Sequence, residues 1–150
     1  MISAYGSGFD ADPTLNHKAF LKYIELNEGT KRHLIAIGGA GSLFTDSTHT
    51  TYCYETPEHP DFLREISKNI KLGIDELKKT SNVNWTVVCP SSFFDSEGAL
   101  TGNYEIGTEE QIIFNEAGES RVTYEDLAMA MIDIAEADNY NQKQITVLTK

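Results

Sequence analysis

Cysteine, long apolar runs and basic residues are all scarce in this sequence. Its two cysteines, Cys53 and Cys89, stand apart in a predicted loop and a predicted buried strand, so we expect no disulfide and a reducing, cytoplasmic setting. No apolar run approaches the roughly 20 residues that a membrane helix needs. The first residues show neither the basic nor the apolar region of a signal peptide. We therefore expect a cytoplasmic protein without a membrane partner.

Charge of one sign dominates. The formal net charge is −11, and residues 95–150 carry 12 acidic against 3 basic side chains. Proteins that bind nucleic acid need basic patches to neutralise phosphates, so we expect no nucleic-acid partner. The acidic excess most simply forms a solvated face. A length of 150 residues suits one domain with a real core, over residues 1–150.

Apolar runs bounded by turn residues predict six strands. The three longer runs are residues 1–5, 33–38 and 83–89, and the three shorter ones are residues 103–106, 111–114 and 145–148. Trp85, inside one of these runs, is expected in the core. Continuous apolar runs are typical of parallel strands buried on both faces.

Helical periods separate these strands. A helix is predicted over residues 14–27, and Gly29 ends it. A second begins near Pro60 and repeats apolar residues on one face, namely Leu63, Ile66, Ile70, Ile74 and Leu77. A third follows the capping box that Thr123 opens and is expected to bury Leu127, Met131, Ile134 and Ala135. Strands alternating with helices predict an α/β fold, a parallel sheet with crossover helices.

Four segments, in order along the chain, resemble one family. Residues 84–91, NWTVVCPS, are similar to the "WT-apolar-apolar-x-P-S" strand of the atypical short-chain dehydrogenase/reductase superfamily. The other three resemble its fourth strand, its fifth strand and the start of a later helix; they are residues 2–6 (ISAYG), 33–42 (HLIAIGGAGS) and 120–130 (SRVTYEDLAMA). The chain most resembles the NmrA-like group, which includes NADH-flavin reductases. This resemblance implies a Rossmann-like fold that binds NAD or NADP.

The resemblance also implies that this sequence corresponds to a C-terminal portion. Full members begin with a βαβαβ half whose GxxGxxG turn lets the backbone approach the cofactor's pyrophosphate. Residues 2–6 match the fourth strand, so we expect a single partial NAD(P)-binding domain, truncated at the N-terminus, with weak or absent dinucleotide binding. Residues 1–5 would then form an exposed sheet edge, through which a homo-oligomer could associate.

Two glycine-rich segments look like dinucleotide fingerprints. Residues 6–11, GSGFDA, match G-x-G-x-x-A, but Asp12 and Pro13 delay the helix that should open inside such a motif. Residues 38–42, GGAGS, are followed by no helical period. We interpret both segments as turns that follow strands.

Lys71 and Ser67 are the candidate catalytic residues. The resemblance places Lys71 at the lysine of the family's Tyr-x-x-x-Lys motif, and Ser67 stands where the tyrosine would be, one helical turn away. Serine is a far weaker acid than tyrosine, whose free pKa is about 10, so tyrosine-dependent ketone reduction is not favoured. Hydride transfer to a flavin or quinone does not need that tyrosine. A solvated helix lysine remains the alternative for Lys71.

The resemblance assigns cofactor-binding residues by position at the carboxyl ends of the strands, where ligands bind in such sheets. The expected lining of the ribose and nicotinamide is Ser3, Ala4, Tyr5 and Gly6. Room for the ring would come from Gly38 and Gly39, and contacts to the nicotinamide amide and the acceptor from Pro90, Ser91 and Phe93. For Pro90 and Ser91, a plain strand-ending turn is equally open.

The sequence thus predicts an NAD(P)H-binding oxidoreductase acting on a flavin, a quinone or another small molecule. A non-catalytic dinucleotide-binding regulatory module of the NmrA type is the alternative, and an inactive remnant a third reading. His49, Cys53 and His59 share one loop, but their spacing is not that of a known zinc module, so no metal is expected.

Overall fold

A five-stranded sheet forms the centre of the protein. The computed structural model describes all 150 residues. The strand order is β1 (Ile2–Ser3), β2 (His33–Ile37), β3 (Asn84–Pro90), β7 (Lys143–Thr149) and β5 (Tyr104–Gly107). The first four strands are parallel, and β5 closes the far edge antiparallel to β7. The predicted α/β fold with a parallel sheet is confirmed, with this one antiparallel edge as a departure.

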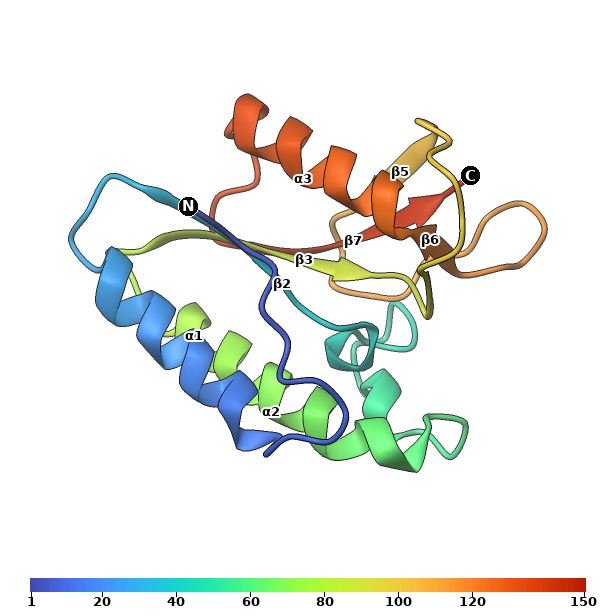
Figure 1. Cartoon of the computed structure of the whole chain (residues 1–150), viewed down its shortest axis with the longest axis horizontal. Coiled ribbons are helices and arrows are strands. Elements are labelled where there is room, and N and C mark those ends of the chain that lie inside the picture. The colour runs from blue at the N-terminus through green and yellow to red at the C-terminus, as the bar shows by residue number, and fades with distance from the viewer.

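Helices cover both faces of the sheet. The helices α1 (Thr14–Asn27) and α2 (Asp61–Lys78) lie side by side on one face, and α3 (Tyr124–Ala137) crosses the other (Figure 1). Each face has its own apolar cluster. One includes Phe20, Ile74, Leu77 and Trp85, and the other includes Leu127, Ala130, Met131 and Ile134. The expectation that Ala135 is buried was wrong: it is exposed, and Ala130 takes the place beside Met131.

Gly73 lets α1 and α2 approach closely. A Cβ atom there would lie 2.5 Å from the ring of Phe20, so any larger residue would force the two helices apart. Phe20 is almost fully buried as a result. The pair of helices is thereby fixed as one layer beneath β2 and β3.

Two short strands form a separate parallel pair that the sequence did not predict. They are β4 (Phe93–Asp95) and β6 (Arg121–Thr123), and the carboxylate of Asp95 accepts hydrogen bonds from the Arg121 guanidinium, which ties them together. The strand predicted at residues 111–114 was wrong. Gln111 makes only an isolated bridge to Phe44, because this segment packs against the loop after β2 and not against the sheet.

The connection after β2 contains two single 3₁₀ turns, η1 (Ala40–Ser42) and η2 (Cys53–Glu55). Both cysteines are free thiols. None of the three α-helices combines the length and the apolarity that crossing a bilayer would require.

Candidate functional site

Three connections leave the carboxyl ends of β1, β2 and β3, namely residues 4–13, 38–60 and 91–103. In Figure 1 residues 4–13 descend from β1 toward the bottom of the view, and the other two connections lie on its right side. In open parallel sheets this edge is where ligands bind. All the residues predicted to bind cofactor stand on these connections or at the strand ends that feed them.

The connection after β1 is open. Ala4, Tyr5 and Gly6 are exposed, and a Cβ atom on Gly6 would meet nothing within 4 Å. Ser3 differs, because its hydroxyl donates a hydrogen bond of 2.7 Å to the Tyr23 hydroxyl. Burial raises the pKa of Tyr23, so this phenol stays protonated. The backbone of residues 4–6 is therefore free to meet a ligand, while the Ser3 side chain already has a partner.

The fingerprint-like segment 6–11 is a turn, as interpreted from the sequence. Helix α1 starts only at Thr14, and Asp12 accepts a hydrogen bond of 2.9 Å from the Thr14 amide. A side-chain hydrogen bond and a backbone hydrogen bond from Thr14 hold the pKa of Asp12 below its ordinary value. This carboxylate occupies the helix N-terminus at which a phosphate would have to bind.

The glycines after β2 fit against the protein itself. A Cβ atom on Gly38 would lie 2.6 Å from Cys89 Sγ and 2.7 Å from Val87 Cγ1, and one on Gly39 would lie 3.3 Å from Ile70 Cδ1. A Cβ atom on Gly41 would overlap the side chain of Ser67. The room that these glycines provide is filled by β3 and α2.

A buried amide holds this glycine-rich loop from below. Gln144, on β7, donates from Nε2 to the carbonyl and the hydroxyl oxygen of Ser42, at 3.1 Å each. The Sγ atom of Cys89 lies 3.6 Å from both side chains. Burial raises the pKa of Cys89, so it remains a neutral thiol and no nucleophile.

Ser67 is buried under the same loop. Its hydroxyl lies 3.1 Å from Nε2 of His59, which comes from the end of the connection after β2. Burial, with a further contribution from the Arg64 charge, lowers the pKa of His59, so the ring is neutral near pH 7. Sequence reasoning placed His59 only in a loop and missed this pair, which folding alone brings together.

Lys71 is not a solvated lysine, and that alternative was wrong. Lys71 is only 8% exposed, and its Nζ atom lies 2.6 Å from both carboxylate oxygens of Asp75. Nζ also lies 4.4 Å from the centre of the Tyr52 ring. Burial lowers the pKa of Lys71, but the hydrogen bonds to Asp75 and to Tyr52 outweigh it, so the net pKa is raised. The ammonium is thus a fixed positive charge and no general base.

Tyr52 belongs to a column of aromatic rings that the sequence did not reveal. Phe44 stacks on His49 with centroids 4.6 Å apart and on Tyr52 at 4.3 Å. Tyr54 lies parallel to Tyr52 at 5.9 Å. The left-handed backbone of His49, with φ of 52°, folds its ring back onto Phe44. This column, against Lys71, orders the connection after β2.

At the end of β3, the predicted residues lie inside the sheet. Pro90 pairs in register with Val147, and the fully buried Ser91 donates a hydrogen bond of 2.6 Å to the Val147 carbonyl. Phe93 is exposed at the start of β4.

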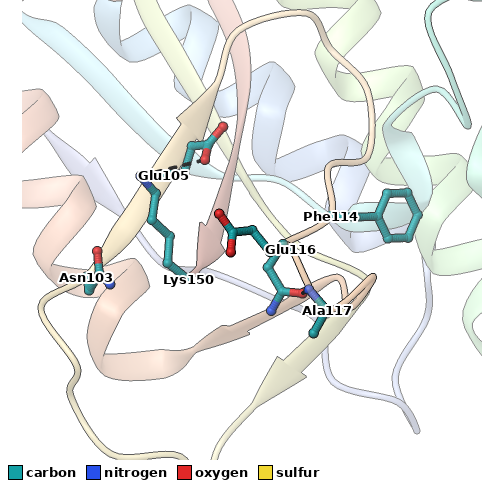
Figure 2. Close-up of a pocket in the computed structure, with 7 residues that line it drawn as sticks. Asn103, Glu105, Phe114, Glu116, Ala117 and Lys150 are labelled. Atoms are coloured by element: carbon teal, nitrogen blue, oxygen red, sulfur yellow. Dashed lines mark hydrogen bonds and ion pairs between the residues drawn. The ribbon is translucent and has the colours of Figure 1, made fainter.

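A hollow lies elsewhere on the molecule. Figure 2 shows it beside β5 and the end of β7, with a volume of about 550 Å³ and seven lining residues, Asn103, Glu105, Phe114, Asn115, Glu116, Ala117 and Lys150. Lys150 Nζ lies 3.8 Å from Glu105 Oε2, and five of the seven lining residues are polar or charged. None of the seven is a predicted site residue.

Known proteins share this architecture. No family model matches the chain. SP1627 from Streptococcus pneumoniae, described as a "putative NADH-flavin reductase", is 34% identical in sequence, and its crystal structure superposes with a TM-score of 0.92. The match covers 99% of this chain and 70% of SP1627. A Rossmann-fold NAD(P)-binding protein from Shigella flexneri shares the fold, with a TM-score of 0.61 at 15% identity. That match covers 99% of this chain and 59% of the Shigella protein.

YwnB of Bacillus subtilis, a protein described as uncharacterized, is 34% identical over 125 residues. The match takes in 83% of this chain but only 58% of YwnB, so the chain spans less than two thirds of that relative. With the fold, the identity and the coverage of SP1627 combined, this chain belongs to the NAD(P)-binding reductase superfamily, in the family of the pneumococcal protein.

Proposed function

We propose that residues 1–150 form a single partial NAD(P)-binding domain of an NADH- or NADPH-dependent reductase whose acceptor is a flavin or a quinone. The observation that carries this proposal is the 34% identity and TM-score of 0.92 to a protein described as a "putative NADH-flavin reductase". The free thiols suit a cytoplasmic setting.

In this proposal the nicotinamide half of the cofactor meets the end of β1. The open backbone at Tyr5 and Gly6 fits a ligand that approaches closely, because no atom stands within 4 Å of a Gly6 Cβ. A bound dihydronicotinamide would supply a hydride, and an acceptor that takes it with one proton from water is reduced by two electrons. The chain's part is to hold and orient the ring.

The diphosphate of the cofactor fits these residues less well than the nicotinamide does. Asp12 stands at the N-terminus of α1, and the glycines of residues 38–42 are packed against β3 and α2. We therefore propose that residues 1–150 by themselves bind dinucleotide weakly or not at all. Calorimetric titration with NADH and NADPH tests this, and a micromolar dissociation constant would refute it.

A second candidate is a dinucleotide-binding regulatory module of the NmrA type, without turnover. It is favoured by the state of the two predicted catalytic side chains. Ser67 is paired with His59, and Lys71 is paired with Asp75 beneath Tyr52, so neither is poised to give a proton to a substrate. Such a module would hold the cofactor at the same strand ends.

Oxidation of the reduced cofactor tests the two candidates. We expect the absorbance of millimolar NADH or NADPH to fall when riboflavin, FMN or a quinone is added with the protein, and to stay constant without an acceptor. Binding without acceptor-dependent oxidation would instead support the regulatory module.

Light scattering tests the homo-oligomer proposed for the β1 edge, where Ile2 is 51% exposed and only β2 pairs with β1.

A further inference from the structure

Two large aromatic side chains lie exposed together beside the proposed site. Phe9, on the connection after β1, is 74% exposed, and Phe62, in the first turn of α2, is 67% exposed. Their ring centroids are 5.8 Å apart, so they form one patch from segments far apart in sequence. Large apolar side chains that gather on a surface in this way mark binding sites more often than chance.

The two rings meet at a right angle. Their planes are 84° apart, which makes an aromatic corner with one face and one edge turned toward a ligand. Aromatic systems prefer offset-stacked and edge-to-face contacts. A flat heterocycle that stacks on one of these rings would therefore meet the edge of the other and gain both contacts at once.

The Phe9 side of the corner is anchored from below. The buried Asn16 of α1 accepts a hydrogen bond from the Ser7 amide and donates one of 2.8 Å to the Ser7 hydroxyl. Gly8, with φ of 76°, then turns the chain so that Phe9 points outward to Phe62. The corner is thus part of the folded structure, and a ligand does not have to create it.

The charges around the corner select among planar ligands. Five carboxylates stand beside it in sequence, namely Asp10, Asp12, Glu58, Asp61 and Glu65. The three nearby cations are already paired, Lys18 with Asp12, Arg64 with Asp61 and Lys68 with Glu65. Arg64 also donates to the backbone carbonyls of Tyr54, Thr56 and His59. Carboxylates thus outnumber cations by five to three around the corner, and this negative balance disfavours a phosphate.

We propose that Phe9 and Phe62 form the binding surface for a planar hydride acceptor that carries no phosphate. This inference builds on the reductase function proposed above and narrows its acceptor. Riboflavin and simple quinones have the required chemistry, whereas FMN brings a phosphate into an acidic surround. The corner belongs to the connection that begins with Tyr5 and Gly6, so one short segment of chain joins the proposed nicotinamide site to the acceptor surface.

Direct binding of riboflavin tests the proposal without any cofactor. Stacking on an aromatic ring quenches flavin fluorescence, so titration of the protein into riboflavin reports binding. We expect riboflavin to bind about tenfold more tightly than FMN, and the gap to narrow at high salt, which screens the carboxylates. Phe9→Ala and Phe62→Ala should each weaken riboflavin binding about fivefold or more.

Phe114→Ala is the matched control. Phe114 is 59% exposed but lies at the hollow beside β5, so its loss should leave riboflavin binding unchanged. Because all three phenylalanines are exposed, the variants should fold, which circular dichroism checks. Equal affinities for FMN and riboflavin would overturn the proposal, as would unchanged binding in both corner variants. A dimer that Phe9→Ala converts to monomer, without riboflavin binding, would show that the corner joins two copies instead.

The outcomes separate this proposal from the reductase function. Riboflavin binding at the corner, with NADH or NADPH also bound at millimolar concentration but not oxidised, would refute the reductase and leave the acceptor surface standing. Oxidation of the cofactor that Phe9→Ala and Phe62→Ala leave unchanged, in both the maximal rate and KM for riboflavin, would refute the corner and leave the reductase.

Discussion

The connection after β2 and the connection after β1 leave the same edge of the sheet and look alike in sequence, yet they are built differently. Residues 38–60 are held by Gln144, by the pairing of Ser67 with His59, and by Tyr52 against Lys71. Residues 4–13 expose Tyr5 and Phe9 to solvent. Both are rich in glycine. What a glycine does therefore depends on what faces its missing side chain, and that is set by tertiary packing.

Gly38→Ala should break the first connection and has the largest expected effect. The new methyl group would overlap Cys89 and Val87 on a central strand, so we expect a loss of about 3 kcal/mol in the free energy of unfolding. Urea denaturation measures it. If Gly38→Ala is as stable as the wild type, the loop after β2 is not packed as described, and the room beside Gly38 is again open to a cofactor ring.

Asp126→Asn tests a third connection, residues 91–103, which is also held from below. The buried Asp126 accepts hydrogen bonds from the Thr101 amide and hydroxyl, the Gly102 amide and the Thr149 hydroxyl, all at 2.7 to 2.9 Å. Removing the charge from this network should cost about 2 kcal/mol near neutral pH, as measured by urea denaturation.

The pH dependence gives this variant its own check. Burial raises the pKa of Asp126, but the hydrogen bonds from Thr101 and Thr149 outweigh it and hold the folded pKa below the ordinary value. A depressed pKa stabilises the fold above the unfolded value of about 3.9 and ceases to do so as pH falls through the folded pKa. The gap between the wild type and Asp126→Asn should therefore shrink as the pH falls below about 4. A gap that stays constant or widens would contradict the assignment.

Regular elements were predictable from the sequence, because their signals are periodic and local. The helix over residues 14–27 has the predicted bounds, and the apolar runs gave the strands of the parallel sheet. The pair β4 and β6 was missed because each strand has only three residues, too few for a periodic signal, and its partner lies 28 residues away in sequence. The apolar segment 111–114 was misassigned because Ile112 is buried against a loop and not in the sheet.

The candidate site was less predictable than the fold. The positions of Lys71 and Ser67 on one helix face follow from their spacing, but their burial depends on Tyr52 and His59. Those two side chains come from a loop without periodicity, so no local pattern places them against α2. Similarly, nothing in the sequence around Phe9 or Phe62 indicates that they meet.

Lys71→Met removes a buried ion-pair partner, and its expected effect on the free energy of unfolding is smaller than that of Gly38→Ala or Asp126→Asn. It leaves Asp75 without its partner, but that carboxylate is 38% exposed and stays hydrated, so we expect a loss of about 1 kcal/mol. Lys68→Met, one turn earlier in the same helix, is the control and should change stability by less than about 0.5 kcal/mol, because the pair of Lys68 with Glu65 is exposed. Equal effects in urea denaturation would show that Lys71 is no more than a surface lysine.

Gly6→Ala is the smallest change and the sharpest counterpart of Gly38→Ala. Gly6 is exposed, no atom would touch the new methyl group, and its backbone is not left-handed. The substitution should thus stabilise the protein by about 0.5 kcal/mol, since alanine restricts the unfolded chain. The same glycine-to-alanine change then has opposite effects on stability in the two connections.

If the open backbone at Gly6 also meets a nicotinamide, the added methyl group should weaken NADH binding further while stability rises. A purely structural role for this turn would not produce that combination. Thermal unfolding and calorimetric titration of the one variant measure both effects.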